Sequence, residues 1–288
     1  MTVVGIGELL WDMLPGGKKI GGAPANFAYH VSQFGIPATV VSAVGCDELG
    51  DELMQELSQK PMGVFVDKVN HPTGTVAVEL AGKGMPTYDI KQDVAWDNIP
   101  FTPELEALAK RTQAVCFGSL AQRSDVSRNT IQKFISAMPD EPGRLKIFDI
   151  NLRQGYHTPQ LIEKSLEVCN VLKINDEELG VLGRMFNLPE CGTKEICRTL
   201  LERYNLDILV LTCGANGSWL FTPDAVSFKP TPKVEVADTV GAGDSFTAAF
   251  TAAILGGKTI DEAHELAVKL SAFVCTQHGA MPSHPESL

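Results

Sequence analysis

The chain has 288 residues, which is near the upper size for a single hydrophobic core. Hydrophobic residues make up 44% of it and charged residues 20%, the proportions of an ordinary soluble globular protein. The formal net charge is −11 at pH 7, which argues against nucleic acid or an anionic membrane as a partner, because both need clustered Lys and Arg. An anionic small ligand is not excluded, since it needs only a local positive site.

The cysteines and the N-terminal segment indicate the compartment. Seven cysteines are present and none forms a Cys-x-x-Cys pair, so reduced thiols are expected rather than a disulfide framework. The opening residues, MTVVGIGELLWDML, lack a basic leader and a small-residue cleavage site. No run of 18 apolar residues occurs that would predict a membrane span. We therefore expect a cytoplasmic protein with no membrane partner.

Short β-branched runs alternate with amphipathic helical patterns along the chain. The predicted strands are residues 2–10, 38–45, 114–120, 145–152, 171–175 and 207–214. The predicted helices are residues 24–35, 49–59, 126–138, 160–169, 177–186 and 194–205. Nearly all-apolar strands joined by amphipathic helices predict an α/β fold with three layers, in which helices cover both faces of a mainly parallel sheet.

Residues 73–94 break this alternation, because they read as two strands around a Gly-rich turn with no helix between them. Such a hairpin is either an edge extension or a cover over a site, and residues 13–20 could add a smaller piece to it. No long linker, repeat or low-complexity tract is present. The simplest prediction is one domain over residues 1–288 with a small β appendage.

Two familiar nucleotide-binding motifs are absent. The stretch GIGELL begins like the dinucleotide fingerprint, but Leu10 stands where its third small residue belongs. No Gly-x-x-x-x-Gly-Lys-Ser/Thr sequence occurs, which excludes a P-loop.

The stretch DTVGAGDSF, residues 238–246, offers another way to bind phosphate. A strand is predicted to end near Val236 and a helix to begin near Gly243. Gly241 and Gly243 let unpaired backbone N–H groups face a ligand, and the helix dipole makes this an anion hole. Asp244 could simply cap the helix, but a cap alone would not require Gly on both sides of Ala242. A carboxylate beside an anion hole suits phosphoryl transfer.

Two motifs carry a family resemblance. DTVGAGDSFTAAF, residues 238–250, resembles the C-terminal signature of the ribokinase-like (PfkB) carbohydrate kinases, and GGAPANFAYHVSQFGIPATVVSAVG, residues 21–45, resembles the N-terminal one. Further landmarks occur in the same order, so the resemblance extends over essentially the whole chain. It implies a ribokinase-like fold and an ATP-dependent sugar kinase that needs Mg²⁺. It leaves open a monovalent cation such as K⁺ and a homodimer.

The resemblance also implies roles for single residues. Asp12, Gly21, Gly22 and Asn26 would bind the sugar, although Asp12 could be a turn residue. Asp244 would be the general base, and Gly241, Ala242 and Gly243 would form the anion hole. Arg153 would offset phosphate charge in catalysis, unless it forms only a surface ion pair. Glu178 would organise Mg²⁺ through water. The nucleotide would be bound by Asn175, Thr212, Gly214, Gly217, His278, Gly279 and Ala280, of which His278 could equally be structural.

The sugar is less well defined by these motifs. GELLWDMLP and GGAPANFA most resemble fructokinases, and Ala23 and Pro24 offer no positive charge to a phosphorylated sugar, which favours free D-fructose. Lys18, Lys19 or Arg153 could still supply that charge. The alternatives are ribose, 2-keto-3-deoxygluconate or another small sugar, and a sugar-sensing binding protein without catalysis. Residues 73–94 with part of 13–20 are expected to form a lid over the sugar.

Overall fold

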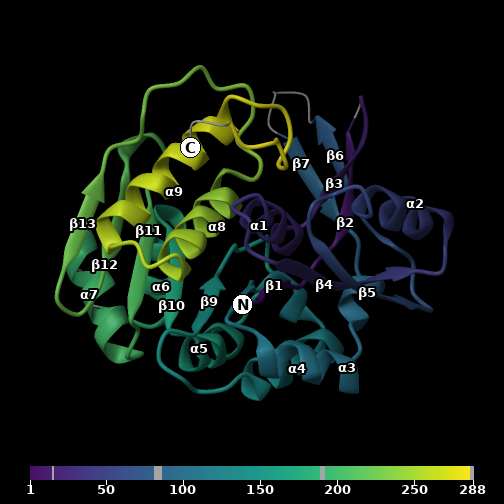
Figure 1. The fold of residues 1–288 in the computed structure, drawn as a ribbon, viewed down its shortest axis with the longest axis horizontal. Coiled ribbons are helices and arrows are strands. Elements are labelled where there is room, and N and C mark those ends of the chain that lie inside the picture. The colour runs from purple at the N-terminus through teal and green to yellow at the C-terminus, as the bar shows by residue number, and fades with distance from the viewer. Residues whose placement is uncertain (15, 81–85, 189–191, 286–288) are drawn as a thin grey trace.

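The computed structural model describes residues 1–14, 16–80, 86–188 and 192–285, and within this part a nine-stranded sheet forms the centre (Figure 1). Strands β11 to β5 of this sheet are parallel, and β12 and β13 are antiparallel at one edge. In spatial order the strands are β13 (Val226–Lys229), β12 (Ser218–Phe221), β11 (Ile208–Thr212), β10 (Val171–Asn175), β9 (Leu145–Asp149), β8 (Ala114–Phe117), β1 (Val3–Ile6), β4 (Ala38–Gly45) and β5 (Gly63–Val69).

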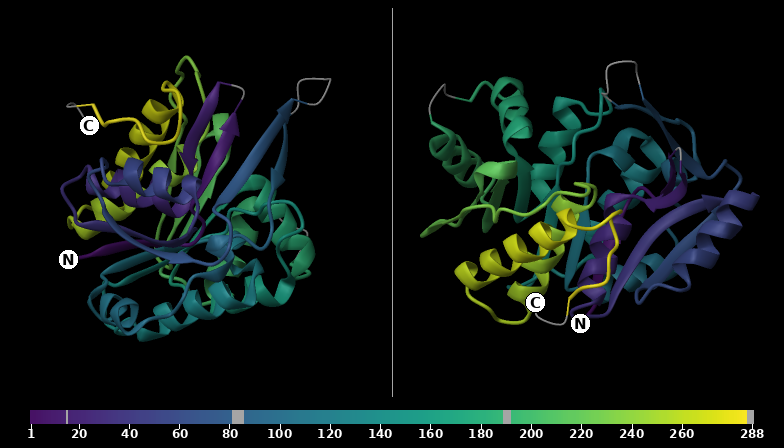
Figure 2. Two further views of the ribbon diagram at one scale, coloured as in Figure 1. Left: turned by 90° about the vertical axis from the view of Figure 1, so that its right-hand side faces the viewer. Right: turned by 90° about the horizontal axis from the view of Figure 1, so that it is seen from above.

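Helices cover both faces of this sheet, as Figures 1 and 2 show. One face is covered by α3 (Pro103–Arg111), α4 (Asp125–Ala137), α5 (Pro159–Val168), α6 (Asp176–Met185) and α7 (Thr193–Arg203). The other is covered by α1 (Ala23–Ser32), α2 (Glu48–Leu57), α8 (Ala242–Leu255) and α9 (Ile260–Cys275). In the described ranges, none of these helices is both long and apolar enough to cross a bilayer.

The predicted fold class is confirmed, but several predicted strands extend beyond the observed ones, and the strand predicted to end near Val236 is absent. Residues 2–10 were expected to form one strand, whereas β1 ends at Ile6 and Gly7, with a φ of 149°, lets the chain turn away from the sheet. Residues 234–236 form no strand. They lie exposed in the loop from β13 to α8 and have no partner strand, so their alternating Val-Glu-Val pattern is not enough to make one.

A second, four-stranded sheet stands beside the central one. Its order is β3 (Gly17–Gly21), β2 (Leu10–Leu14), β6 (Gly74–Leu80) and β7 (Pro86–Ile90). Strands β2 and β6 are parallel, and the two outer pairs are antiparallel. The predicted lid segments therefore share one sheet, although residues 15 and 81–85 of those segments lie outside the described part of the chain. Whether this sheet works as a lid stays a prediction.

The carboxyl ends of parallel strands bring the predicted site residues to one edge. Strand β9 ends at Asp149, β10 at Asn175 and β11 at Thr212. Helices α1 and α8 pack against each other and begin at this same edge. Ligands of open α/β sheets bind at such an edge, so the topology positions a site between the strand ends and the two helix N-termini.

A buried ion pair joins the end of the second sheet to the main body. Arg123, at the end of the short helix η2 (Leu120–Arg123), donates from Nε and Nη2 to the two carboxylate oxygens of Asp97 at 2.8 Å. Its guanidinium stacks over the Trp96 ring at 4.0 Å from the ring centroid. It also donates to the carbonyl of Lys91, directly after β7. Both side chains of the ion pair are less than a tenth exposed.

We predict that Asp97→Ala lowers the free energy of unfolding by about 3–5 kcal/mol, because it leaves the Arg123 charge buried without its partner. Guanidinium denaturation followed by circular dichroism measures this loss. Asp140→Ala, which removes a fully exposed carboxylate paired to Lys146, should leave the denaturation midpoint unchanged. Equal midpoints for the two variants would contradict the prediction.

Candidate active site

The first turn of α8 has backbone amides that are available to an anion. Gly241 caps the helix in the left-handed conformation, with a φ of 77°, which glycine adopts without steric penalty. The predicted anion hole included Ala242, but its amide donates to the Thr239 carbonyl at 3.3 Å. Among the described residues, the backbone amides of Gly243 and Asp244 have no hydrogen-bond acceptor. These two amides lie at the positive end of the helix dipole, where anions are stabilised.

Asp244 is held from α1. The Nδ2 group of Asn26 donates to Oδ2 of Asp244 at 2.7 Å, so two residues 218 positions apart in the chain are in contact. Burial, followed by the nearby charge of Asp149, raises the pKa of Asp244 to about 6, against opposing contributions from Asn26, Lys173 and Arg153. A buried carboxylate with a pKa near neutrality is suited to accepting a proton.

A second buried carboxyl, which the sequence prediction missed, lies close to Asp244. Glu8 is 4% exposed, and burial raises its pKa to about 7, with Asp244 as the main charge adding to this effect. Its carboxylate approaches the amide of Ala23, the first residue of α1. The signal in the sequence was an acidic residue between the apolar segments Gly-Ile-Gly and Leu-Leu. A carboxylate in such a buried segment costs free energy, so its presence there indicates a function.

A buried lysine, also missed from the sequence, lies under the first turn of α8. Lys173, in β10, donates from Nζ to Oδ1 of Asp149 at 3.0 Å, and Thr247 of α8 donates to Oδ2 at 3.0 Å. Burial alone would lower the pKa of Lys173, but the charges of Asp149, Glu178 and Asp244 raise it above its ordinary value. The lysine is therefore a fixed cation, and its Nζ lies only 2.9 Å from where a Cβ on Gly243 would be.

The predicted sugar-binding residues come from β2, the end of β3 and the start of α1. Asp12, in β2, is partly buried, and this burial raises its pKa to about 6 while Arg153 lowers it. Gly21 is required by this arrangement, because its Cβ would lie 2.4 Å from Oδ2 of Asp12. Gly22, with a φ of 118°, similarly allows the backbone of Glu8 to approach. Arg153 is exposed, and its charge lowers the pKa of Asp12, Glu8 and Asp244, so the three carboxyl groups share one cationic neighbour.

Glu178 holds two strand ends together. It forms a capping box with Asn175: Oδ1 of Asn175 accepts from the Glu178 amide at 2.8 Å, and Oε2 of Glu178 accepts from the Asn175 amide at 2.9 Å. Oε1 of Glu178 accepts from the amide of Leu152, after β9, at 2.9 Å. The side chain is 5% exposed, so it fixes the loop that carries Arg153.

The predicted nucleotide residues lie next to these strand ends. Asn175 and Thr212 are paired neighbours on β10 and β11. Gly214 begins the short helix η3 (Gly214–Asn216), and its carbonyl accepts from the Thr231 hydroxyl at 2.6 Å. Gly217 has a φ of 102°, and its Cβ would lie 2.6 Å from the carbonyl of Lys229, so only glycine suits this turn.

The segment of residues 278–280 lies against the first turn of α8. The Gly279 amide donates to Oδ2 of Asp238 at 3.1 Å. Ala280 is buried, and its Cβ lies 2.7 Å from where a Cβ on Gly241 would be. The side chain of His278 is exposed, and its predicted role in binding the nucleotide has less support from the structure than the roles of Gly279 and Ala280.

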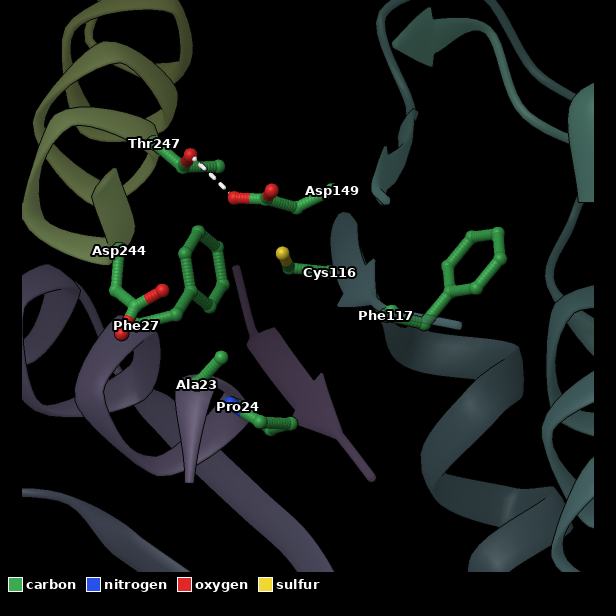
Figure 3. A pocket seen from close by; sticks show the side chains of 9 residues that line it. Ala23, Pro24, Phe27, Cys116, Phe117, Asp149, Asp244 and Thr247 are labelled. Atoms are coloured by element: carbon green, nitrogen blue, oxygen red, sulfur yellow. Dashed lines mark hydrogen bonds between the residues drawn. The ribbon is translucent and has the colours of Figure 1, made fainter. Parts of the chain in front are cut away.

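A small cavity separates Asp244 from Asp149, as Figure 3 shows. It has a volume of about 10 Å³, room for one water molecule. Cys116 lines it, and burial, followed by the charges of Asp149 and Asp244, raises the pKa of its thiol well above the ordinary value. This cysteine is therefore not a nucleophile, and a sugar must reach Asp244 from another side.

Comparison with known proteins decides the family. The pfkB family of carbohydrate kinases matches residues 15–287. The chain belongs to this family. This kinase is therefore an ATP-binding transferase that acts on carbohydrate.

The relatives of this kinase differ in their substrates. An uncharacterized sugar kinase of Pyrococcus horikoshii, solved in complex with ATP, is 28% identical, with a TM-score of 0.81 over 98% of this chain and 94% of that one. The fructokinase of Salmonella typhimurium is 28% identical over 97% of this chain and 95% of that protein. The ATP-dependent 6-phosphofructokinase of Thermoanaerobacterium thermosaccharolyticum is 26% identical over 99% of this chain and 91% of that protein. Both a free and a phosphorylated sugar thus occur among the substrates named for these relatives.

The site is compatible with a magnesium ion that arrives with the triphosphate. Within the described ranges, no group of three or more His, Cys, Asp or Glu side chains could hold a metal by itself. Mg²⁺ usually keeps several waters and takes only one or two carboxylates besides phosphate oxygens. Glu178 fits such a role, because a carboxylate has about four acceptor positions and two are used by backbone amides.

We predict that Gly243→Ala lowers kcat for sugar phosphorylation about tenfold to a hundredfold, because the added methyl group must displace Lys173 from the first turn of α8. Steady-state kinetics beside a melting curve measure this effect. Gly183→Ala is the control, because a Cβ there meets nothing within 4 Å. The prediction fails if Gly243→Ala keeps wild-type turnover per folded molecule.

Proposed function

We propose that this kinase is a fructokinase, which converts ATP and D-fructose to ADP and fructose 6-phosphate. The observation that carries the proposal is the buried Asp244 carboxylate. This carboxylate lies in the first turn of α8 and accepts a hydrogen bond from Asn26 of α1, and Lys173 lies beside the same turn of α8. The arrangement combines a proton acceptor, an anion site and a fixed cation within one helical turn.

Asp244 acts as the general base. The 6-hydroxyl of the sugar gives its proton to the Asp244 carboxylate as its oxygen forms a bond to the γ-phosphorus. The bond from that phosphorus to the bridging oxygen breaks at the same time, and ADP leaves with the electron pair. Asn26 fixes the carboxylate through one oxygen, which leaves the other free to face the hydroxyl.

The transferring phosphoryl group is stabilised by groups that are already in place. The amides of Gly243 and Asp244 point out of the helix, and Lys173 lies beneath them as a permanent cation. In a buried site such fixed charges need little reorganisation as the transition state forms. Arg153 adds positive charge on the side of the acceptor, near Asp12 and Glu8.

The sugar lies between the main body and the second sheet. Asp12 and Asn26 can bind hydroxyl groups, whereas Ala23 and Pro24 bring no charge toward a sugar phosphate. Lys18 is already paired with Glu52 and lies over the Trp11 ring. These features support a free sugar, and the Salmonella typhimurium fructokinase supports fructose as that sugar.

ATP is bound by the residues at the ends of β10 and β11 and by residues 278–280, with Mg²⁺ on its phosphates. When bound, Mg²⁺ supplies positive charge that neutralises the phosphates. Glu178 would hold that ion through its waters, and the bonds from the Leu152 and Asn175 amides keep its carboxylate in place.

A panel of acceptors tests the substrate. ADP release is measured with D-fructose, D-ribose, 2-keto-3-deoxygluconate and fructose 6-phosphate, and phosphorus NMR gives the position of transfer. D-fructose should have the highest kcat/KM, and excess chelator should abolish activity. A higher value for another acceptor would reject fructose but keep the kinase. Sugar binding by calorimetry without ADP release would indicate a sensing protein instead.

We predict that Asp244→Asn folds and binds both substrates but loses about 10²–10⁴-fold in kcat, because the amide cannot accept the proton. In the wild type, kcat should rise with pH through about 6 and then level off, because burial raises the pKa of Asp244 to about 6 and only the ionised form is a base. Stopped assays across pH 4.5–8 measure both effects. A residual activity of Asp244→Asn near that of the wild type would remove Asp244 from the mechanism.

The second sheet is proposed to act as a lid over the sugar. Asp12 lies on β2 of this sheet, and β6 pairs directly with β2, so the sugar-binding carboxylate is carried by the sheet itself. Arg123 anchors the end of β7 to the main body. A sheet anchored at one end and in contact with the sugar can exclude water from the phosphoryl group as it closes.

We predict that replacing residues 76–89 with a short Gly-Ser linker raises the KM for the sugar and increases ATP hydrolysis without transfer. The ratio of ADP formed to sugar phosphate formed measures the second effect. An unchanged ratio and an unchanged KM in a folded variant would reject the lid. A halved mass in solution would show that the same strands form a dimer interface.

A further inference from the structure

A pair of histidines binds the C-terminal segment to α1. His30 is fully buried on α1, and its Nε2 lies 2.8 Å from the carbonyl oxygen of Ala280. Its Nδ1 lies 2.9 Å from Nε2 of His284. Gln33 makes two further hydrogen bonds to this segment. It donates to the carbonyl of Pro282 at 3.2 Å and accepts from the backbone amide of His284 at 2.8 Å. The segment runs beside α1 in the right-hand view of Figure 2.

The chemistry of these contacts allows one arrangement of protons. A carbonyl oxygen only accepts, so Nε2 of His30 carries the proton. In the neutral ring Nδ1 of His30 must then accept, and Nε2 of His284 is the donor. Burial lowers the pKa of both histidines to about 4, so both rings are neutral at physiological pH. The two bonds therefore form a directed chain from His284 through His30 to Ala280.

The end of this chain touches the anion site. Ala280 packs on Gly241, which caps α8 in the left-handed conformation. A Cβ on Gly241 would lie 2.7 Å from the Cβ, 2.8 Å from the Cα and 2.9 Å from the carbonyl oxygen of Ala280. The acceptor of the His30 hydrogen bond is thus the same carbonyl group that lies against Gly241. A shift of Ala280 would allow the first turn of α8 to move.

The same helix also holds the base. Asn26 is four residues before His30, so both side chains project from one face of α1. Asn26 donates to Asp244, and His30 donates to Ala280. Helix α1 is therefore linked to the first turn of α8 in two ways. Asn26 bonds directly to Asp244, and His30 holds Ala280, which lies against the cap residue Gly241.

We propose that His284 and His30 are positioning residues for phosphoryl transfer: they hold Ala280 against Gly241 and so keep the anion site aligned with Asp244. This inference rests on the proposed role of Asp244 as the base. Neither histidine needs to contact the sugar or the phosphates, and their effect passes through the backbone of Ala280. Their loss should therefore reduce turnover more than sugar binding.

The test compares two substitutions at His284, which is only partly buried. His284→Leu keeps much of the volume but removes the donor, and we expect kcat to fall about tenfold to a hundredfold with the KM for the sugar changed less than about twofold. His284→Gln can still donate to His30, and we expect it to retain at least a third of the wild-type kcat. Gln33→Leu removes the other two bonds to the segment and should lower kcat in the same direction.

A matched control separates positioning from stability. His264, on α9, is another fully buried histidine, bonded to the hydroxyls of Ser218 in β12 at 2.7 Å and Ser227 in β13 at 2.9 Å. His264→Leu should lower the melting temperature but keep kcat per folded molecule. The proposal is overturned if His284→Leu keeps wild-type kcat, or if the Leu and Gln variants lose it equally. Asp244→Asn in the same assay shows separately whether the base itself is correctly assigned.

Discussion

The buried ion pair between Asp149 and Lys173 is the interaction on which the active site depends. Two charges removed from water are tolerated only when they are paired and hydrogen-bonded, and Thr247 provides the additional bond to Asp149. Because Thr247 belongs to α8, the pair also ties that helix to the ends of β9 and β10. It leaves Lys173 charged beneath Gly243 and raises the pKa of Asp244 through the charge of Asp149. One pair therefore contributes to both the anion site and the base.

An acidic protein can bind an anionic substrate in this way because charge is arranged locally. The chain carries a net charge of −11, yet two cations act on the carboxyl groups of the site: Lys173 on Asp244, and Arg153 on Glu8, Asp12 and Asp244. Those carboxyl groups have raised pKa values because they are buried. Glu8, with a pKa of about 7, is only partly ionised at neutral pH, so the local field is less negative than the composition suggests, which favours binding of ATP together with a neutral sugar.

Helix α1 connects the parts of the site that come from distant regions of the chain. It begins at Ala23, directly after β3 of the sheet that carries Asp12, and it contacts Asp244 through Asn26 and the C-terminal segment through His30. A rigid helix can hold these groups at fixed distances, which loops could not do. Family membership alone is compatible with several sugars, because the relatives named above carry the names of kinases for different acceptors.

The fold class and the family could be predicted from the sequence, because both depend on local order: apolar strands alternate with amphipathic helices, and the Gly-Ala-Gly-Asp of the family signature is contiguous in the chain. The strand predicted to end near Val236 is absent because a strand also needs a partner, which no local pattern supplies. Glu8 and Lys173 could have been noticed only as charges within apolar segments, and nothing local showed what they face. His30 and His284 are 254 positions apart, so only the packing of α1 against the C-terminal segment makes them neighbours. The sequence by itself determined which groups are available for phosphoryl transfer. The tertiary structure decided which of them are buried together, and burial is what shifts their pKa values and fixes their geometry.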